Sequence, residues 1–200
     1  MSVGVVIGTY GDRSWVQKSQ RAVQSVRSQT RQPNLLITRH ATTLAEARNQ
    51  GASMCRTQWI IFLDADDTLH PEYVRSMMER VEDASDALLV QPATQGVYPD
   101  GTKDETANLI PPCPAGLAWA NHMVIGTMCP REQFLEVGGF DDTLPVLEDW
   151  DLWIRMNRAG CEVTTCEDAV YEVGVNVDSR NKPQKTHTDV ANLIRRKYRV

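Results

Sequence analysis

The chain has 200 residues, with 21 Lys or Arg against 26 Asp or Glu, so its formal net charge at pH 7 is −5. This length suits a single domain over residues 1–200, and 42% hydrophobic with 24% charged residues excludes a disordered or fibrous chain. The acidic balance also disfavours a general nucleic-acid-binding protein, because it provides no long-range attraction for phosphate backbones.

The sequence contains no apolar run near the roughly 18 residues that a membrane helix needs, and it begins with a strand-like segment instead of a signal sequence. We therefore expect a cytoplasmic protein without membrane insertion. The five cysteines form no C-x-x-C pair, so reduced thiols are expected instead of a disulfide framework or a zinc site.

The first 90 residues alternate between strand and helix patterns. Continuous apolar runs predict buried strands, and apolar residues at helical spacing after Ser, Thr or Pro signals predict helices. The expected strands are residues 3–9, 35–38, 59–63 and 87–90, and the expected helices are residues 14–29, 43–54 and 72–81. This alternation predicts an α/β fold with a mixed, mainly parallel sheet flanked by helices.

The second half is less regular. Five of the ten prolines lie in residues 91–116, which predicts turns and loops there. Further along, residues 123–128 are an apolar, strand-like run, and helices are expected from Pro130 to the Gly138-Gly139 pair and over residues 148–159. The polar residues 176–200 are expected to form a mobile tail with a weak helix over residues 188–198.

Three carboxylates, Asp64, Asp66 and Asp67, follow the clearest predicted strand. Their mutual repulsion is costly unless solvent or a cation compensates it, and carboxylate oxygens suit Mg²⁺ or Mn²⁺. Ligands bind at the carboxyl ends of strands in open α/β sheets, so the cluster indicates a metal site that could bridge two phosphates of a nucleotide. On the motif alone, an Asp-rich turn that caps the next helix is an equally good explanation.

Two further clusters carry polar side chains. Glu148-Asp149 stands at a predicted helix start, where acidic residues also occur simply as caps. The preceding Gly138-Gly139-Phe140-Asp141-Asp142 segment adds a glycine turn, as a loop that closes on a substrate would require. Arg48-Asn49 could pair with a phosphate or a nucleobase, although an ordinary solvated helix surface is the alternative.

Taken in this order, the segments resemble those of family 2 glycosyltransferases with the Rossmann-like GT-A fold, in the compact form seen in bacteria and bacteriophages. Residues 5–10, Val-Val-Ile-Gly-Thr-Tyr, look like the first strand with its nucleotide contact. Residues 62–67, Phe-Leu-Asp-Ala-Asp-Asp, look like the D-x-D metal motif. Gly138-Gly139-Phe140-Asp141 with Glu148-Asp149 looks like the catalytic segment on the acceptor side.

The resemblance implies an inverting enzyme that moves a sugar from a UDP-, GDP- or dTDP-linked donor to an acceptor hydroxyl, with Mn²⁺ or Mg²⁺ as cofactor. The acceptor could be a glycan, a protein or a modified base. Approximately residues 1–90 would bind the donor, and approximately residues 116–175 would form the acceptor and catalytic half. Asp149 would be the general base. The donor and substrate contacts would be Thr9, Tyr10, Arg48, Asn49, Asp64 and Glu148, and the metal ligands would be Asp64 and Asp66.

The sequence departs from the family pattern at two points. Arg39-His40-Ala41-Thr42 stands where many members carry an Asp-Asp-Gly-Ser segment, which leaves the choice of base open. Gly174 stands near the position of a further metal-ligand His. His187 is a candidate third metal ligand that could replace that His if the tail folds over the site, although a solvated His is the more common state in a polar tail. In addition, Trp119 could stack on a sugar.

Three other functions compete with this interpretation. A non-catalytic nucleotide- or glycan-binding module on the same scaffold would keep the fold without turnover. A sugar-phosphate nucleotidyltransferase would need a phosphate-cradling loop, and residues 8–13 offer only two glycines and one cation. A dinucleotide oxidoreductase is disfavoured because no G-x-G-x-x-G follows the first strand.

Overall fold

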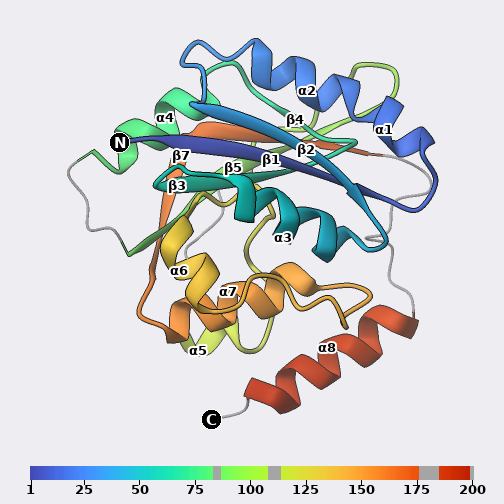
Figure 1. Ribbon diagram of the computed structural model, residues 1–200, viewed down its shortest axis with the longest axis vertical. Helices are drawn as coiled ribbons and strands as arrows, with labels where there is room; N and C mark the ends of the chain where they lie inside the picture. Colours follow the sequence, from blue (N-terminus) through green and yellow to red (C-terminus); the bar gives the residue numbers. More distant parts are fainter. Residues whose placement is uncertain (83–86, 108–113, 176–184, 199–200) are drawn as a thin grey trace.

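The computed structural model describes residues 1–82, 87–107, 114–175 and 185–198. Two sheets with strand orders β2-β1-β3-β6 and β4-β7-β5 lie among the helices (Figure 1). The strands are β1 (Val3–Tyr10), β2 (Leu35–Ala41), β3 (Trp59–Asp64), β4 (Thr68–Leu69), β5 (Leu88–Val97), β6 (Cys129–Pro130) and β7 (Glu162–Gly174). The helices are α1 (Ser14–Lys18), α2 (Gln20–Arg27), α3 (Leu44–Met54), α4 (Tyr73–Arg80), α5 (Pro114–Leu117), α6 (Arg131–Glu136), α7 (Glu148–Arg158) and α8 (Lys185–Tyr198). Among the described helices, none combines the length and the apolar composition that a membrane crossing requires.

The first sheet carries the site. Strand β1 pairs in parallel with β2 on one side and with β3 on the other, and only the short β6 runs antiparallel. Helices α1 and α2 cover one face of this sheet, and α3 covers the other (Figure 1). The parallel pairing of β1 with β2 and β3 confirms the predicted α/β class and mainly parallel sheet here. Helices cover both faces of these strands, which explains why their sequences are continuously apolar.

Helix α3 approaches β1 closely and begins at a well-defined cap. A Cβ atom on Gly51 would lie 2.4 Å from Cγ1 of Val6, so a glycine is needed at this crossing. The Thr43 hydroxyl accepts a hydrogen bond from the Glu46 backbone N–H (3.1 Å), and the Glu46 carboxylate accepts one from the Thr42 N–H (3.0 Å). These bonds confirm the predicted helix start and fix it beside the end of β1.

The second sheet differs from the sequence-based expectation. Strand β7, which the sequence pattern did not predict, pairs antiparallel with β4 and parallel with β5. Because β7 supplies partners along its length, β5 continues to Val97, into the segment expected to be loop. The apolar run at residues 123–128 is not a strand; only Met128 makes an isolated bridge, with Val90, before β6 begins. The expected helix over residues 14–29 is divided at Ser19 into α1 and α2.

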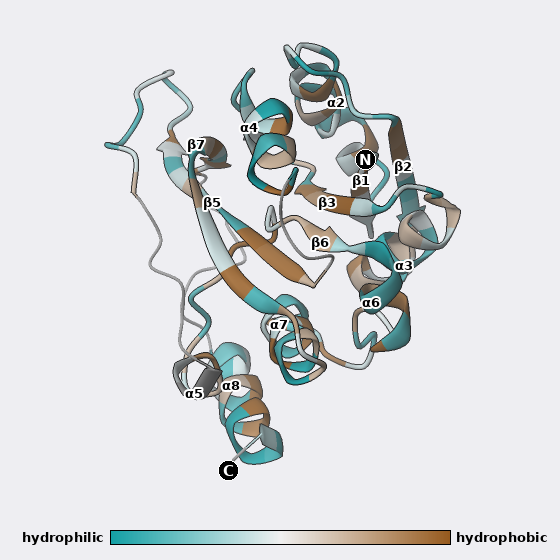
Figure 2. Ribbon diagram, turned by 90° about the vertical axis from the view of Figure 1, so that its left-hand side faces the viewer, coloured by the Kyte–Doolittle hydropathy of each residue, from teal (hydrophilic) through white to brown (hydrophobic). Residues whose placement is uncertain are grey.

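Helix α8 lies at the same end of the molecule as α5 and α7 (Figures 1 and 2). Val190, Ile194 and Tyr198 are buried, at the spacing of one helical face. The helix expected over residues 188–198 is confirmed as α8, which begins at Lys185 and packs against the domain through this face. The rest of the segment expected to be a mobile tail lies outside the described residues.

Candidate active site

A buried arginine joins the two acidic clusters. Arg48 on α3 is only 2% exposed, and its Nη1 donates to Oε1 of Glu148 at 2.8 Å. Its Nη2 donates to Oδ1 of Asp64, at the end of β3. Burial opposes the charge of Arg48, but the carboxylates of Asp64 and Glu148 outweigh this effect and raise its pKa above the usual value. The guanidinium therefore stays charged and holds the end of β3 next to the start of α7.

Asp149 follows Glu148 at the start of α7 and is partly buried. Its carboxylate accepts hydrogen bonds from the backbone N–H of Trp150 (2.7 Å) and from Nδ2 of Asn121 (3.2 Å). Burial, followed by the charge of Glu148, raises the pKa of Asp149 to about 6, although Arg48 and the two hydrogen bonds oppose the shift. A carboxylate with a pKa near neutrality is suited to accept a proton during a reaction.

The residue before this helix has an unusual backbone. Leu147 has φ 61° and ψ 23°, in the left-handed region that residues other than glycine rarely adopt. Such a conformation costs about 1–3 kcal/mol, and it persists only where the surroundings enforce it. This left-handed residue lies directly before Glu148 and Asp149, at the start of α7.

The three carboxylates after β3 occupy different environments. Asp64 and Asp66 are partly exposed, whereas Asp67 is buried and accepts a hydrogen bond from the Gly174 N–H (2.8 Å). The Tyr171 hydroxyl bonds to Asp67 and accepts a hydrogen bond from the Asp64 N–H (3.1 Å). Burial, with the charges of Asp64 and Asp66, raises the pKa of Asp67 to about 8. Asp67 therefore ties the loop to β7, and Asp64 and Asp66 are the members that can face a ligand.

The expected metal ligands are not preassembled as a set of three. Within the described part of the chain, no group of three or more His, Cys, Asp or Glu side chains is arranged to hold a metal ion. His187 lies in the first turn of α8, partly buried, and its Nδ1 has no hydrogen-bond partner. The structure therefore brings Asp64 together with Arg48 and Glu148, but it does not gather Asp64, Asp66 and His187 around one point.

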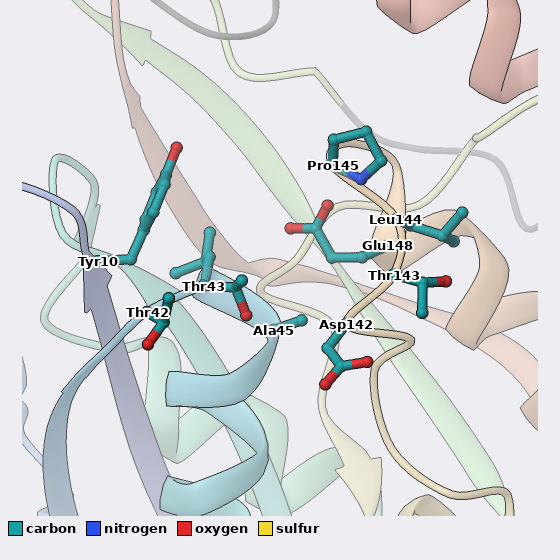
Figure 3. Close-up of a pocket in the computed structure, with 10 residues that line it drawn as sticks. Tyr10, Thr42, Thr43, Ala45, Asp142, Thr143, Leu144, Pro145 and Glu148 are labelled. Carbon is teal, nitrogen blue, oxygen red and sulfur yellow. The ribbon is translucent and has the colours of Figure 1, made fainter.

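A pocket of about 320 Å³ opens between the start of α3 and the loop before α7. In Figure 3, Tyr10 stands on one side of this pocket and the Glu148 carboxylate faces it from the other. The pocket is lined by Tyr10, Thr42, Thr43, Leu44, Ala45, Asp142, Thr143, Leu144, Pro145 and Glu148. Two of the predicted substrate contacts, Tyr10 and Glu148, thus line one pocket.

Thr9 and Asn49 hold neighbouring backbone instead of lining that pocket. The Thr9 side chain lies under the end of β2, where its hydroxyl donates to the Arg39 carbonyl (3.2 Å) and lies 3.0 Å from Nδ1 of His40. Both polar groups of Asn49 bond to the main chain of Phe140: Nδ2 donates to the carbonyl (2.8 Å), and Oδ1 accepts from the N–H (2.9 Å). In this structure, Asn49 positions the glycine loop.

Sequence reasoning did not identify several residues of the site. Asn121 lies in an irregular segment and reaches Asp149 only through the fold, so no local pattern marks it. Tyr171 belongs to β7, which was not predicted. Thr43 was recognised as a helix start and Thr42 as part of a departure from the family pattern, but neither as part of a pocket.

The family follows from the sequence comparison. Residues 11–139, well over half of the chain, match the model of glycosyl transferase family 2. The chain belongs to this family. An uncharacterized glycosyltransferase of Haemophilus influenzae is 29% identical to it over 119 residues, which cover 56% of this chain and 40% of that protein.

Solved structures of the same fold agree with this assignment. S. aureus TarS superposes on 97% of this family 2 chain and 39% of its own length, with a TM-score of 0.71 and 12% identity. TarS 1-349 in complex with UDP-GlcNAc gives a TM-score of 0.74 and 12% identity, over 97% of this chain and 65% of that one. The chain thus spans less than two thirds of each of these proteins. The predicted family and fold are confirmed.

Proposed function

We propose that this family 2 chain transfers a sugar from a nucleotide-sugar donor to an acceptor hydroxyl, with inversion at the anomeric carbon and Asp149 as the general base. One observation carries this proposal: the buried Arg48 binds Asp64 and Glu148 at once. It thereby places the carboxylates after β3, suited to a diphosphate-bound cation, beside the helix start that carries a carboxylate with a pKa of about 6.

The donor nucleotide would occupy the pocket between Tyr10 and Glu148, and the Tyr10 ring, which lines this pocket, would pack against the base. The TarS 1-349 fragment has been crystallised with UDP and with UDP-GlcNAc. This precedent supports testing UDP-sugars first, followed by GDP- and dTDP-sugars.

The residues present fit a divalent cation that is shared with the substrate. Mg²⁺ is commonly held by one or two carboxylates together with substrate phosphates and water, so it does not require a complete set of protein ligands. Asp64 and Asp66 would supply these carboxylates, and His187, whose Nδ1 has no hydrogen-bond partner, would be a further ligand to test. When bound, Mn²⁺ or Mg²⁺ would offset the negative charge that develops on the leaving diphosphate.

The chain's own residues would handle the proton. The acceptor oxygen forms a bond to the anomeric carbon, while the bond from that carbon to the diphosphate oxygen breaks and its electron pair leaves with the nucleoside diphosphate. Asp149 takes the proton of the acceptor hydroxyl. Its hydrogen bonds to Asn121 and to the Trp150 N–H hold the carboxylate in place, so that it needs little reorganisation during transfer.

The test is release of nucleoside diphosphate from a panel of UDP-, GDP- and dTDP-sugars, with Mn²⁺, with Mg²⁺ or with EDTA. Metal-dependent release from one donor would support the proposal if Asp66→Asn and Asp149→Asn each abolish it. Both variants should keep the thermal unfolding midpoint of the wild type, so that the loss is not caused by unfolding. Nucleotide binding without release, under all donors and with added glycan, protein or nucleic-acid acceptors, would contradict it and favour a binding module. Pyrophosphate release from a nucleoside triphosphate and a sugar phosphate would favour a nucleotidyltransferase.

A further inference from the structure

Trp119 has an unusual position for a tryptophan. It follows α5 and is 64% exposed, more than any other large hydrophobic residue in the described part of the chain. Trp15 aside, the remaining tryptophans, Trp59, Trp150 and Trp153, are all buried. An exposed indole of this size presents a large, rigid apolar face that a ligand can cover, with a gain from the apolar area removed from water.

The backbone that carries Trp119 is fixed at three points. The Leu117 carbonyl accepts a hydrogen bond from Nε1 of Trp150 (2.6 Å), and the Trp119 carbonyl accepts one from Nε of Arg195 on α8 (2.9 Å). Two residues later, Asn121 donates to Asp149 (3.2 Å). The indole is therefore presented from a held segment, which lowers the entropy lost when a ligand binds.

The same three bonds place this segment beside the proposed general base. Asn121 is the direct link, because its Nδ2 contacts the Asp149 carboxylate while its Oδ1 accepts from the Met123 N–H (3.1 Å). His122, the next residue, is exposed. The exposed indole thus lies two residues before Asn121, whose side chain contacts the carboxylate that would deprotonate the acceptor.

We infer that Trp119 forms an acceptor subsite that binds the apolar face of a sugar ring, so that the acceptor is a saccharide. This inference rests on the proposed function. A pyranose presents C–H groups on one face and hydroxyls around its rim, and it is matched by an aromatic ring flanked by hydrogen-bonding side chains. A protein or lipid partner would be expected to use a broader contiguous apolar patch.

The experiment measures binding of the full chain to an array of immobilised oligosaccharides, with affinities for the bound glycans then determined by titration of the free sugars. Trp119→Ala should weaken binding at least about ten-fold, and Trp119→Phe, which keeps an aromatic face, should recover most of it. Tyr98→Ala is the matched control, because Tyr98 is also an exposed aromatic residue, 39% accessible, but lies at the end of β5. It should bind like the wild type.

The outcomes separate this inference from the proposed function. Glycans bound equally by the wild type and by Trp119→Ala would overturn the inference, as would an array on which the wild type binds no saccharide. Loss of binding in both Trp119→Ala and Tyr98→Ala would also count against it, because the effect would not be specific to the indole. Donor hydrolysis by the wild type, measured separately, tests the proposed function without reference to Trp119.

Discussion

Arg48 and Glu148 stand 100 positions apart in the sequence, yet Nη1 of the first donates to Oε1 of the second at 2.8 Å with both residues buried. The two side chains come from helices on different sides of the pocket, α3 and α7. Asp64 shares the same guanidinium, so three elements of the site depend on one cation. Buried charges of this kind are costly when a partner is lost, because the remaining charge has neither water nor a counterion.

Replacing Arg48 should therefore destabilise the fold strongly. Arg48→Met should lower the free energy of unfolding by about 3–5 kcal/mol, because it leaves Glu148 and Asp64 uncompensated. Urea unfolding measures the loss. The double variant Arg48→Met with Glu148→Gln should lose less than the sum of the two single variants, and strictly additive losses would show that the pair is not coupled.

Transfer should depend on the ionisation of Asp149. Since the pKa of Asp149 is raised to about 6 and a general base acts in its deprotonated form, kcat/KM should rise with pH through about 6 and level off above it. Glu148→Gln removes a charge that raises this pKa, so the rise should move to lower pH. Asn121→Ala removes a hydrogen bond to the ionised form, so the rise should move to higher pH. A pH profile that stays unchanged in both variants would contradict the assignment of Asp149.

The glycine pair before Phe140 offers a matched comparison. Gly138 (φ 87°) and Gly139 (φ 68°) both have left-handed backbone, so alanine is strained at either position. Only at Gly139 would the new Cβ meet another group, Oδ1 of Asn49 at 2.5 Å, whereas nothing lies within 4 Å at Gly138. Gly138→Ala should cost about 1 kcal/mol, and Gly139→Ala should cost more, because it also breaks the bonds between Asn49 and Phe140. Equal losses for the two variants in urea unfolding would show that the Asn49 contact does not stabilise the loop.

The parts of the fold predictable from the sequence were those with local signals. Continuous apolar runs predicted β1 and β3, and the capping pattern of Thr43 and Glu46 predicted the start of α3. Strand β7 was missed because it pairs with β5 and β4, segments far from it in the chain, and its own residues are only partly buried. The site residues divide in the same way. Tyr10 and Glu148 belong to local sequence motifs and could be predicted. The contact of Asn121 with Asp149 and the hydrogen bonds of Asn49 to the Phe140 main chain join distant segments, so no local pattern marks them.

Helix α8 is held to α7 by a buried carboxylate. Asp151, fully buried on α7, accepts hydrogen bonds from Arg155 (2.7 Å), Lys197 (2.9 Å) and Tyr198 (2.6 Å). Burial opposes its ionisation, but the bonds from Tyr198, Lys197 and Arg155 outweigh burial and lower the pKa of Asp151 below its usual value. The docking of α8 therefore depends on this carboxylate being ionised.

The stability that Asp151 provides should then vanish in acid. A carboxyl group with a lowered pKa in the folded state stabilises the fold above its unfolded pKa, and this contribution is lost as pH falls through the folded value. Tyr198→Phe should lower the free energy of unfolding at pH 7 by about 1.5–3 kcal/mol, because it removes a hydrogen bond to a buried charge. Lys197→Met, at an exposed position, should cost about 1 kcal/mol or less. Urea unfolding at pH 7 and at pH values below 4 measures both effects, and an equal loss for Tyr198→Phe at the two extremes would show that Asp151 is not the group that ties α8 to α7.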